Sequence, residues 1–419
     1  MLLAAAVLGY PSPILINWNQ TFSEGELVSN THLAKITGLS SYLDALERSN
    51  DQDLVMILDG LDAWLQLKPS VMVERYHHIN NHANERMQHL YGRLAVETHQ
   101  LQQKIIFSTD KVCWPVAFEK PGCFAVPDST LAPTLYGPRT DTDAPELAAP
   151  EHYDDPRRFW RPKWLNSGGV VGTVKEVRHL ADRAKVYSTL PEHDYKGSDQ
   201  GIYQDIFGDQ EIWRQAEGMG LTTEEGSNWY RDHIESGVDY EFGIGLDYEE
   251  AMVLSTAEHK GETAWIRYGD RAEIERISVE SGMIRSRMPS LPADIARSGM
   301  PFEFPQADAY GNDWNTLPLI TNLRSGITPV VIHHNAWAWG AKELINTTWG
   351  NMWYQPHAEA MYRHAESAGD RLQQTETSTG EQYEWVSNAG IIRTDSGGVL
   401  RYSDVCAGAW EDLFASQIS

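Results

Sequence analysis

The sequence predicts an α/β protein with a largely parallel sheet, and two observations lead to this prediction. Residues 53–58 and 104–108 are short, continuously apolar runs, which are typical of strands buried on both faces. Segments of helical spacing separate these runs, so that the chain begins in β-α-β-α-β order. A chain of 419 residues is too long to fold around one small hydrophobic core. We therefore expect one large domain with additions rather than two equal domains.

The first segment, residues 1–18, is interpreted as a buried strand because it is mostly apolar. The alternative is a signal peptide, but the basic residues that open one are lacking. A chain that begins inside a strand would have residues upstream of it, and these could include a membrane anchor. Within the chain itself, no stretch is long and apolar enough to cross a bilayer.

The rest of the first half alternates helices and strands. Residues 113–160 are rich in Pro, Asp and Thr and predict a long loop, and a loop of this length usually has a function. The expected elements are a helix at 33–48, a strand at 53–58, a helix at 69–96, a strand at 104–108 and a strand at 164–172.

The second half is less regular. Between residues 208 and 325 we expect short strands and loops without a helical core. The other expected elements are helices at 173–190, 201–207 and 359–374, a strand at 329–333, and a β-hairpin at 390–402 around a Ser-Gly-Gly turn.

The composition is strongly acidic. With 34 Lys and Arg against 59 Asp and Glu, the formal net charge is −25. This charge argues against nucleic acid as the main partner, because binding to phosphates requires a basic surface. It argues equally against electrostatic docking on an anionic membrane.

Three cysteines are present. Cys113 and Cys123 flank a short loop, and they are either disulfide-bonded in an oxidising compartment or two unrelated thiols, with Cys406 left over. Sequons for N-glycosylation begin at Asn19 and Asn346, and they favour a secretory setting.

A pair of carboxylates follows the strand at 53–58. Ligands of open α/β sheets bind outside the carboxyl ends of the strands, where Asp59 and Asp62 are expected to lie. Gly60 between them allows the sharp bend that aims both carboxylates at one point. Such a pair suits Mg²⁺ or Mn²⁺ with substrate phosphates. The alternative is that Asp59 caps a helix and Asp62 is solvated.

The strand at 329–333 ends in two histidines followed by Asn335. Because side chains alternate along a strand, only one of His333 and His334 can face the same site as the two acids. An imidazole beside two carboxylates suits Mn²⁺ better than Mg²⁺. The alternative is a buried, hydrogen-bonded histidine.

Further candidate residues lie at a turn and at two element ends. Asn166 and Gly168 belong to a Gly-Gly turn that could leave backbone amides free for a ligand, or that could be purely structural. Asp199 opens a helix and Asp247 follows a strand, and either could act as a base, although Asp199 could also be a helix cap. Lys342 could neutralise a phosphate, or simply be solvated.

Taken in order, these motifs resemble the glycosyltransferase domain of procollagen lysyl hydroxylases and its fungal relatives. The resemblance covers roughly residues 50–340. It rests on five motifs: Asp59-Gly-Leu-Asp62, Cys113-Trp-Pro115, Leu165-Asn-Ser-Gly-Gly169, Ser198-Asp-Gln200 and His333-His-Asn335.

The resemblance implies a GT-A (Rossmann-like) fold. We expect this domain to span residues 1–355, and residues 356–419, which the family does not share, to form an appended helix and β-hairpin. The resemblance also implies a Mn²⁺ ion, a UDP-sugar donor, a protein or glycan acceptor, and a place in the Golgi lumen or among secreted proteins. Carried over by position, the metal ligands would be Asp59, Asp62 and His333. Asn166 and Asp199 would lie near the transferred sugar. Our own candidates for contacts with the donor are Gly60, Leu61, Gly168 and Lys342.

The sequence departs from the family pattern at three positions. Leu61 stands where the family often has Tyr, Ser198 replaces the first acid of an Asp-Asp-Gln motif, and His334 replaces Gly. Leu61 and Ser198 motivate a second interpretation, a non-catalytic sugar-binding or interaction protein. A third interpretation, a metal-dependent hydrolase, fits the order of the motifs least well.

Overall fold

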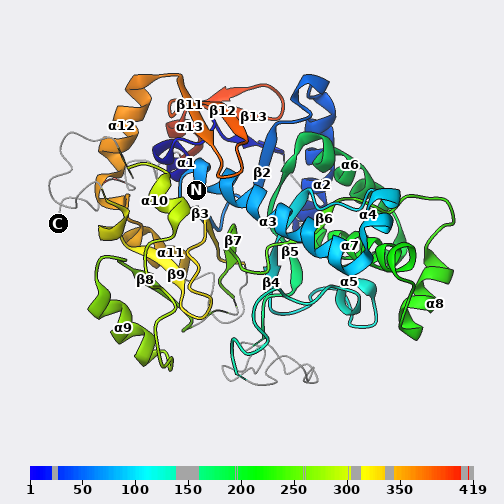
Figure 1. Ribbon diagram of the computed structural model, residues 1–419. Helices are drawn as coiled ribbons and strands as arrows, with labels where there is room; N and C mark the ends of the chain where they lie inside the picture. The colour runs from blue at the N-terminus through cyan, green and yellow to red at the C-terminus, as the bar shows by residue number, and fades with distance from the viewer. Residues whose placement is uncertain are drawn as a thin grey trace.

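The protein is a mixed α/β structure in which helices surround several small sheets (Figure 1). The computed structural model describes residues 1–20, 27–137, 160–193, 195, 197–257, 259, 261–300, 302, 313–335, 344–406 and 414. In this part of the chain, no helix combines the length and the apolar character that a membrane crossing requires.

The largest sheet has the strand order β2-β5-β4-β6, formed by Leu54–Leu58, Trp164–Thr173, Ile105–Asp110 and Ile244–Leu246. β4 and β6 are parallel, but β5 is antiparallel to both β2 and β4. The prediction of a largely parallel sheet is therefore wrong. β5 begins opposite the end of β4, at the Asp110–Trp164 pair, so it must run back along β4 as the second strand of a hairpin does.

A second sheet has the order β3-β10-β7, formed by Ala63–Leu65, Val331–His333 and Val253–Ser255. β10 is antiparallel to β3 and parallel to β7. In this register His333 pairs with Ala63, the residue after Asp62. The sheet thus places the end of β10 beside the segment that joins β2 to β3.

The apolar residues form two large clusters on opposite sides of β4. Ile105 and Phe107 belong to the cluster under α2 (Leu27–Ala45), α6 (Val174–Tyr187) and α7 (Asp199–Gly218). Ile106 belongs to the other cluster, which contains residues of α3 (Pro69–Tyr91) and of the second sheet. This alternation is the one expected of a strand buried on both faces.

The expected helix at 69–96 is divided in two. α3 ends at Tyr91 and α4 (Arg93–His99) follows, with Gly92 between them at a φ of 81°. This φ lies in a region that side-chain-bearing residues rarely adopt, and it interrupts the helical path.

The expectation that residues 208–325 lack helices is wrong. α7 extends to Gly218, and the segment also contains α8 (Glu224–His233), α9 (Arg271–Glu280) and α10 (Ala293–Arg297), with β8 (Thr263–Ile266) and β9 (Leu319–Asn322). The side chains of Thr223 and Asp270 cap α8 and α9 by accepting backbone N–H bonds. Such caps help to start short, polar helices.

The N-terminal segment is a helix, α1 (Leu2–Leu8), and not the expected strand. Its Leu and Ala residues have high helix propensity, which decides the outcome for a run with only one β-branched residue. α1 packs against α12 (Ala358–Ala368), and β1 (Ile14–Leu15) pairs with β13 (Ile392–Thr394). The beginning of the chain therefore shares a core with its C-terminal region, while the boundary at residue 355 stays a prediction.

The C-terminal region contains more strands than expected. The helix predicted at 359–374 ends at Ala368, and a hairpin of β11 (Arg371–Glu376) and β12 (Gln382–Ser387) follows. The predicted hairpin at 390–402 is confirmed as β13 and β14 (Val399–Leu400). The region also contains α11 (Leu344–Asn351), a short 3₁₀ helix (Gln355–His357) and α13 (Tyr402–Cys406).

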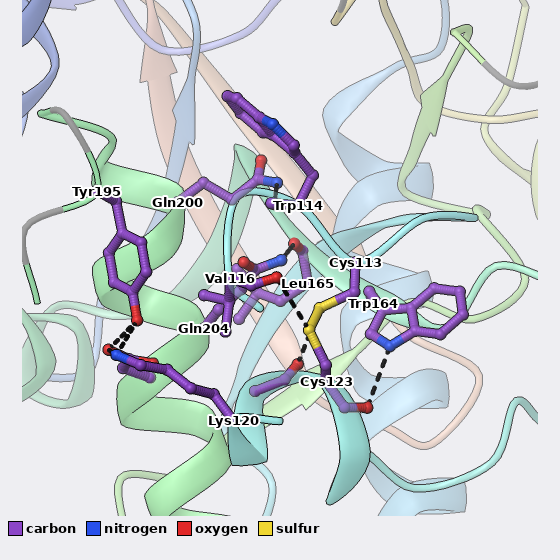
Figure 2. Close-up of a disulfide and its surroundings, with 12 residues drawn as sticks. Cys113, Trp114, Val116, Lys120, Cys123, Trp164, Leu165, Tyr195, Gln200 and Gln204 are labelled. Carbon is purple, nitrogen blue, oxygen red and sulfur yellow. Dashed lines mark hydrogen bonds and ion pairs between the residues drawn. A yellow bond between two sulfur atoms is a disulfide. The ribbon is translucent and has the colours of Figure 1, made fainter. Parts of the chain in front are cut away.

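A disulfide joins Cys113 and Cys123, which settles the alternative between a bridge and two thiols (Figure 2). The bridged loop leads into α5 (Pro121–Phe124), which contains Cys123 and packs closely on α7. A Cβ on Gly122 would lie 2.6 Å from the backbone oxygen of Gln204. The side chain of Gln200 on α7 also donates to the backbone oxygen of Trp114 in this loop. The bridge therefore supports the start of α7.

Candidate metal centre

The two carboxylates lie in the short connection between β2 and β3. Asp59 follows the last residue of β2, and its backbone N–H donates to the oxygen of Gly168 at 3.2 Å. Asp62 precedes β3 and is 5% exposed, whereas Asp59 is partly exposed. Strand ends thus position both residues, as the sequence predicts.

His333 completes the group. Its Nε2 lies 3.7 Å from Asp59 Oδ2 and 3.6 Å from Asp62 Oδ1. One ligand atom from each of the three residues lies within 4.8 Å of the others, so the group could hold a metal ion. Residues from two distant parts of the sequence therefore converge, as expected for His333.

The residues present fit a divalent cation. His333 is 2% exposed, and neither of its ring nitrogens has a hydrogen-bond partner among the described residues. A buried polar atom usually has a partner, and one that lacks it calls for a ligand, a water or an ion. Two carboxylates and one imidazole form a donor set that Mn²⁺ accepts readily.

His334 faces a different environment. Its Nδ1 lies 3.0 Å from Thr256 Oγ1, and its Nε2 lies 2.9 Å from Thr348 Oγ1. Its backbone N–H donates to the backbone oxygen of Asp62. This is the alternation that the strand pattern predicts.

Gly168 is packed directly against the ring of His333. A Cβ at this position would lie only 1.9 Å from His333 Cε1, so no larger residue fits without moving the histidine. The Gly168 N–H donates to Asn166 Oδ1 at 2.8 Å. The register between β4 and β5 shifts at this place, as it does at a β-bulge beside many functional sites.

Lys35 of α2 bridges two acids of the site. Its Nζ lies 2.8 Å from Asp59 Oδ1 and 2.9 Å from Asp199 Oδ2. Burial raises the pKa of Asp59, but His333 and Lys35 outweigh burial and hold that pKa well below its usual value. The pKa of Lys35 is raised, because the two acids outweigh the lowering effect of burial.

Asp199 is therefore linked through Lys35 to the group of Asp59, Asp62 and His333. It is the first residue of α7 and is 5% exposed. Besides Lys35, it accepts a hydrogen bond from Ser167 Oγ at 3.1 Å, while the side chain of Gln200 accepts from the Ser167 N–H. The start of α7 is thus tied to the Gly-Gly turn of β5.

Asp110, at the end of β4, was not predicted from the sequence. Its two oxygens accept from the side-chain amides of Asn166, at 2.9 Å, and Asn335, at 2.8 Å. Burial raises the pKa of Asp110 to about 6, although the hydrogen bond from Asn166 and the nearby His333 oppose this shift. The strand-end rule that identified Asp59 also applies to Asp110 and could have found it.

Asp247 occupies a different position from the one expected of a base. It is 1% exposed, and its carboxylate accepts three backbone N–H bonds, from residues Ala251, Met252 and Val253. Burial raises its pKa to about 7 despite these bonds. Its described side-chain bonds stabilise the turn from β6 to β7 and do not reach the Asp59 group.

Gly60, Leu61 and Lys342 are the remaining residues that the sequence analysis predicts to contact the donor. Nothing lies within 4 Å of the position that a Cβ on Gly60 would take, and the side chain of Leu61 is 95% exposed, so both residues lie at the surface beside Asp59 and Asp62. Lys342 lies outside the described residues.

Comparison with known proteins does not assign the chain to a family. No protein-family model matches the sequence, and no curated protein matches it. The function is therefore inferred from the motifs and from the geometry of the site.

Replacing Lys35 with methionine is expected to tighten binding of Mn²⁺ alone by about fivefold. The variant removes a competing cation from Asp59, and a partly exposed ion pair contributes about 1 kcal/mol, which corresponds to this factor. Isothermal titration with Mn²⁺ measures the change. Lys175→Met removes an exposed lysine elsewhere and serves as the control for net charge. Equal affinities in both variants would contradict the competition.

Proposed function

We propose that the protein is a Mn²⁺-dependent glycosyltransferase that moves a hexose from a UDP-sugar to an acceptor hydroxyl in the secretory pathway. The observation that carries the proposal is the convergence of Asp59, Asp62 and His333 on one point. Each belongs to a motif of the resemblance, and each is placed by the end of a strand or by the segment between two strands.

Contacts of the surrounding residues support the proposal. Asp59, Asp62 and His333 would hold the ion, which would supply positive charge for the leaving diphosphate. Asp199 contacts Ser167 of the Gly-Gly turn, and it would accept the proton of the acceptor hydroxyl in an inverting reaction. Asn166 and Asn335 fix Asp110, so the polar wall of the site is held in place.

The acidic character of the protein supports a role for the metal. A chain with a net charge of −25 offers a nucleotide diphosphate little general attraction. Asp59 and Asp62 would repel the diphosphate unless a cation lies between them. Donor binding is therefore expected to depend strongly on metal.

The fold and the disulfide are compatible with this assignment. β2 and β4 run in the same direction, because both are antiparallel to β5, and β6 is parallel to β4. A GT-A arrangement is the fold that we propose for these strands. The Cys113–Cys123 bridge suits an oxidising compartment such as the Golgi lumen or the extracellular space.

A second candidate is a non-catalytic sugar-binding protein that retains the fold. Two observations favour it: Ser198 leaves Asp199 as the only acid at the start of α7, and Lys35 and Ser167 already contact the carboxylate of Asp199. Binding of the nucleotide alone does not separate this candidate from the enzyme, whereas turnover does.

The test is a thermal shift assay with UDP, with and without Mn²⁺, followed by a UDP-release assay. We expect UDP to raise Tm by several degrees only when Mn²⁺ is present, because a ligand bound by the native state alone stabilises it. Release of UDP from one of a panel of UDP-sugars would establish the enzyme. Metal-dependent binding without release would favour the binding protein, and the lack of any metal-dependent shift would refute the enzyme.

A further inference from the structure

The first of the two N-glycosylation sequons begins in a surface turn. Asn19 is the last residue of the turn at 16–19, which follows β1, and it is exposed. The backbone N–H of Gln20 donates to the oxygen of Asn17 at 3.2 Å and closes this turn. An N-linked glycan is bulky and needs an asparagine on the surface of the protein, in a loop or turn. Asn19 meets both conditions.

Contacts of Asn17 fix this turn to the rest of the protein. The backbone N–H of Asn17 donates to Asp395 Oδ2 at 2.7 Å, and its Nδ2 donates to the backbone oxygen of Ala34 on α2 at 2.7 Å. A Cβ added to Gly38, also on α2, would collide with the side-chain amide of Asn17. The side chain of Asn17 is therefore packed closely against α2. A bulky group on the exposed Asn19 would disrupt none of these contacts.

The backbone at Asn19 has a φ of 61°, in the left-handed region. Among residues other than glycine, asparagine is one of the few that adopt this conformation readily. Glutamine at this position would be strained, so Asn19→Gln could disturb the turn as well as remove the glycan. A test of modification therefore needs a variant that keeps Asn19 itself.

The second sequon has a different structure. Asn346 and Thr348 both belong to the helix α11, and Thr348 is 4% exposed. The Thr348 hydroxyl donates to the backbone oxygen of Leu344 at 2.8 Å, and its Oγ1 lies 2.9 Å from Nε2 of His334. The hydroxyl residue is an essential part of the recognised sequon, and here it is engaged within the fold. A helical sequon with a buried threonine is a poor substrate for modification.

We propose that Asn19 is N-glycosylated in the secretory pathway and that Asn346 is not. In this reaction the side-chain nitrogen of Asn19 forms a bond to the anomeric carbon of an oligosaccharide that is carried on a lipid diphosphate. The bond between that carbon and the diphosphate oxygen breaks, the lipid diphosphate leaves, and the amide nitrogen loses one proton. A separate enzyme of the pathway attaches the glycan, so the inference does not depend on the proposed glycosyl transfer.

The experiment is to secrete the full chain from eukaryotic cells behind a cleavable leader and to map its glycans by peptide mass spectrometry. Enzymatic release of the glycans in heavy-oxygen water converts each glycosylated asparagine into a labelled aspartate. We expect the label at Asn19 and none at Asn346. Thr21→Ala destroys the first sequon and keeps Asn19, although Thr21 itself lies outside the described residues. This variant should lose the whole glycan and migrate faster on a denaturing gel.

Two further variants serve as controls. Asn346→Gln should carry the same glycan as the wild type, and glutamine is well tolerated within a helix. Thr21→Ser retains a sequon and should keep the glycan, which separates loss of the hydroxyl from a defect in folding. Secreted wild-type protein without a label at Asn19 would overturn the proposal. A label at Asn346 would also overturn it, because α11 would then not protect the second sequon.

Discussion

Replacing Gly168 with alanine is expected to abolish metal binding at the Asp59 group. The added Cβ would lie 1.9 Å from Cε1 of His333, and it would also lie 2.5 Å from each ring nitrogen. Real Cβ atoms do not approach other atoms this closely, so either the imidazole or the β5 turn must move. Because β10 holds His333 in register with β3, and the ring is almost fully buried, the histidine has little room in which to adapt.

The expected magnitude is large in both measurable quantities. Overpacking at a buried position typically costs about 1–3 kcal/mol of stability. Displacing a ligand should weaken Mn²⁺ binding by more than the roughly 10–100-fold that follows from losing a supporting residue outside the ligand shell. Calorimetry with Mn²⁺ and thermal unfolding of the metal-free protein measure the two effects separately.

Gly60→Ala is the matched control for Gly168→Ala. Gly60 lies between the two acids, but nothing is within 4 Å of the position that its Cβ would take. The control should therefore bind Mn²⁺ like the wild type. If Gly168→Ala binds Mn²⁺ as tightly as Gly60→Ala does, then His333 is not a ligand and the metal is held by other residues.

The sequence predicts the metal group because the group depends on local rules. Asp59 and His333 each follow or end an apolar strand, and ligands of α/β sheets lie beyond such strand ends. The same rule covers Asp110, which was overlooked because only one acid stands there and no neighbouring acid marks it. The alternation of a strand allows only one of His333 and His334 to face the two acids, and the family resemblance selects His333.

Lys35 illustrates what local rules miss. A lysine on a helix is usually solvated, and nothing in the sequence around Lys35 distinguishes it from other lysines. Its role arises only from the packing of α2 against α7, which brings its ammonium group between Asp59 and Asp199. Contacts between residues so far apart in sequence depend on the tertiary fold.

The errors in the fold have similar causes. Apolar runs do not reveal strand direction, so the reversed orientation of β5 could not be read from its composition. The apolar segment at the N-terminus is too short for periodicity to separate a helix from a strand, and here the helix propensity of Leu and Ala decides. α8 and α9 are short and polar, and the capping side chains of Thr223 and Asp270 mark where they begin.

Replacing Asp59 and Asp62 together with asparagine is expected to remove both the Mn²⁺ binding and the metal-dependent effect of UDP. Asparagine keeps the size of each side chain but removes the two negative charges that attract the cation. Since the loss of one outer partner already weakens metal sites by roughly 10–100-fold, the loss of two ligand charges should leave no binding at millimolar Mn²⁺. Thermal shift with UDP and Mn²⁺, together with UDP release, measures the outcome.

Asp247→Asn separates this result from a general loss of stability. Its carboxylate accepts three backbone N–H bonds, and the amide nitrogen of asparagine cannot accept any of them. This variant should lower Tm of the metal-free protein, because a buried donor left unpaired costs about 1–3 kcal/mol, but it should keep the Mn²⁺-dependent effect of UDP. The Asp59→Asn/Asp62→Asn variant should keep the Tm of the metal-free protein but lose the Mn²⁺-dependent effect of UDP, since Asp59 is partly exposed and both residues lie in a connection between strands.

Retention of UDP release in the double variant would show that the two acids are not the metal ligands of the reaction. Loss of UDP release in Asp247→Asn with its metal response intact would instead return Asp247 to the role of base.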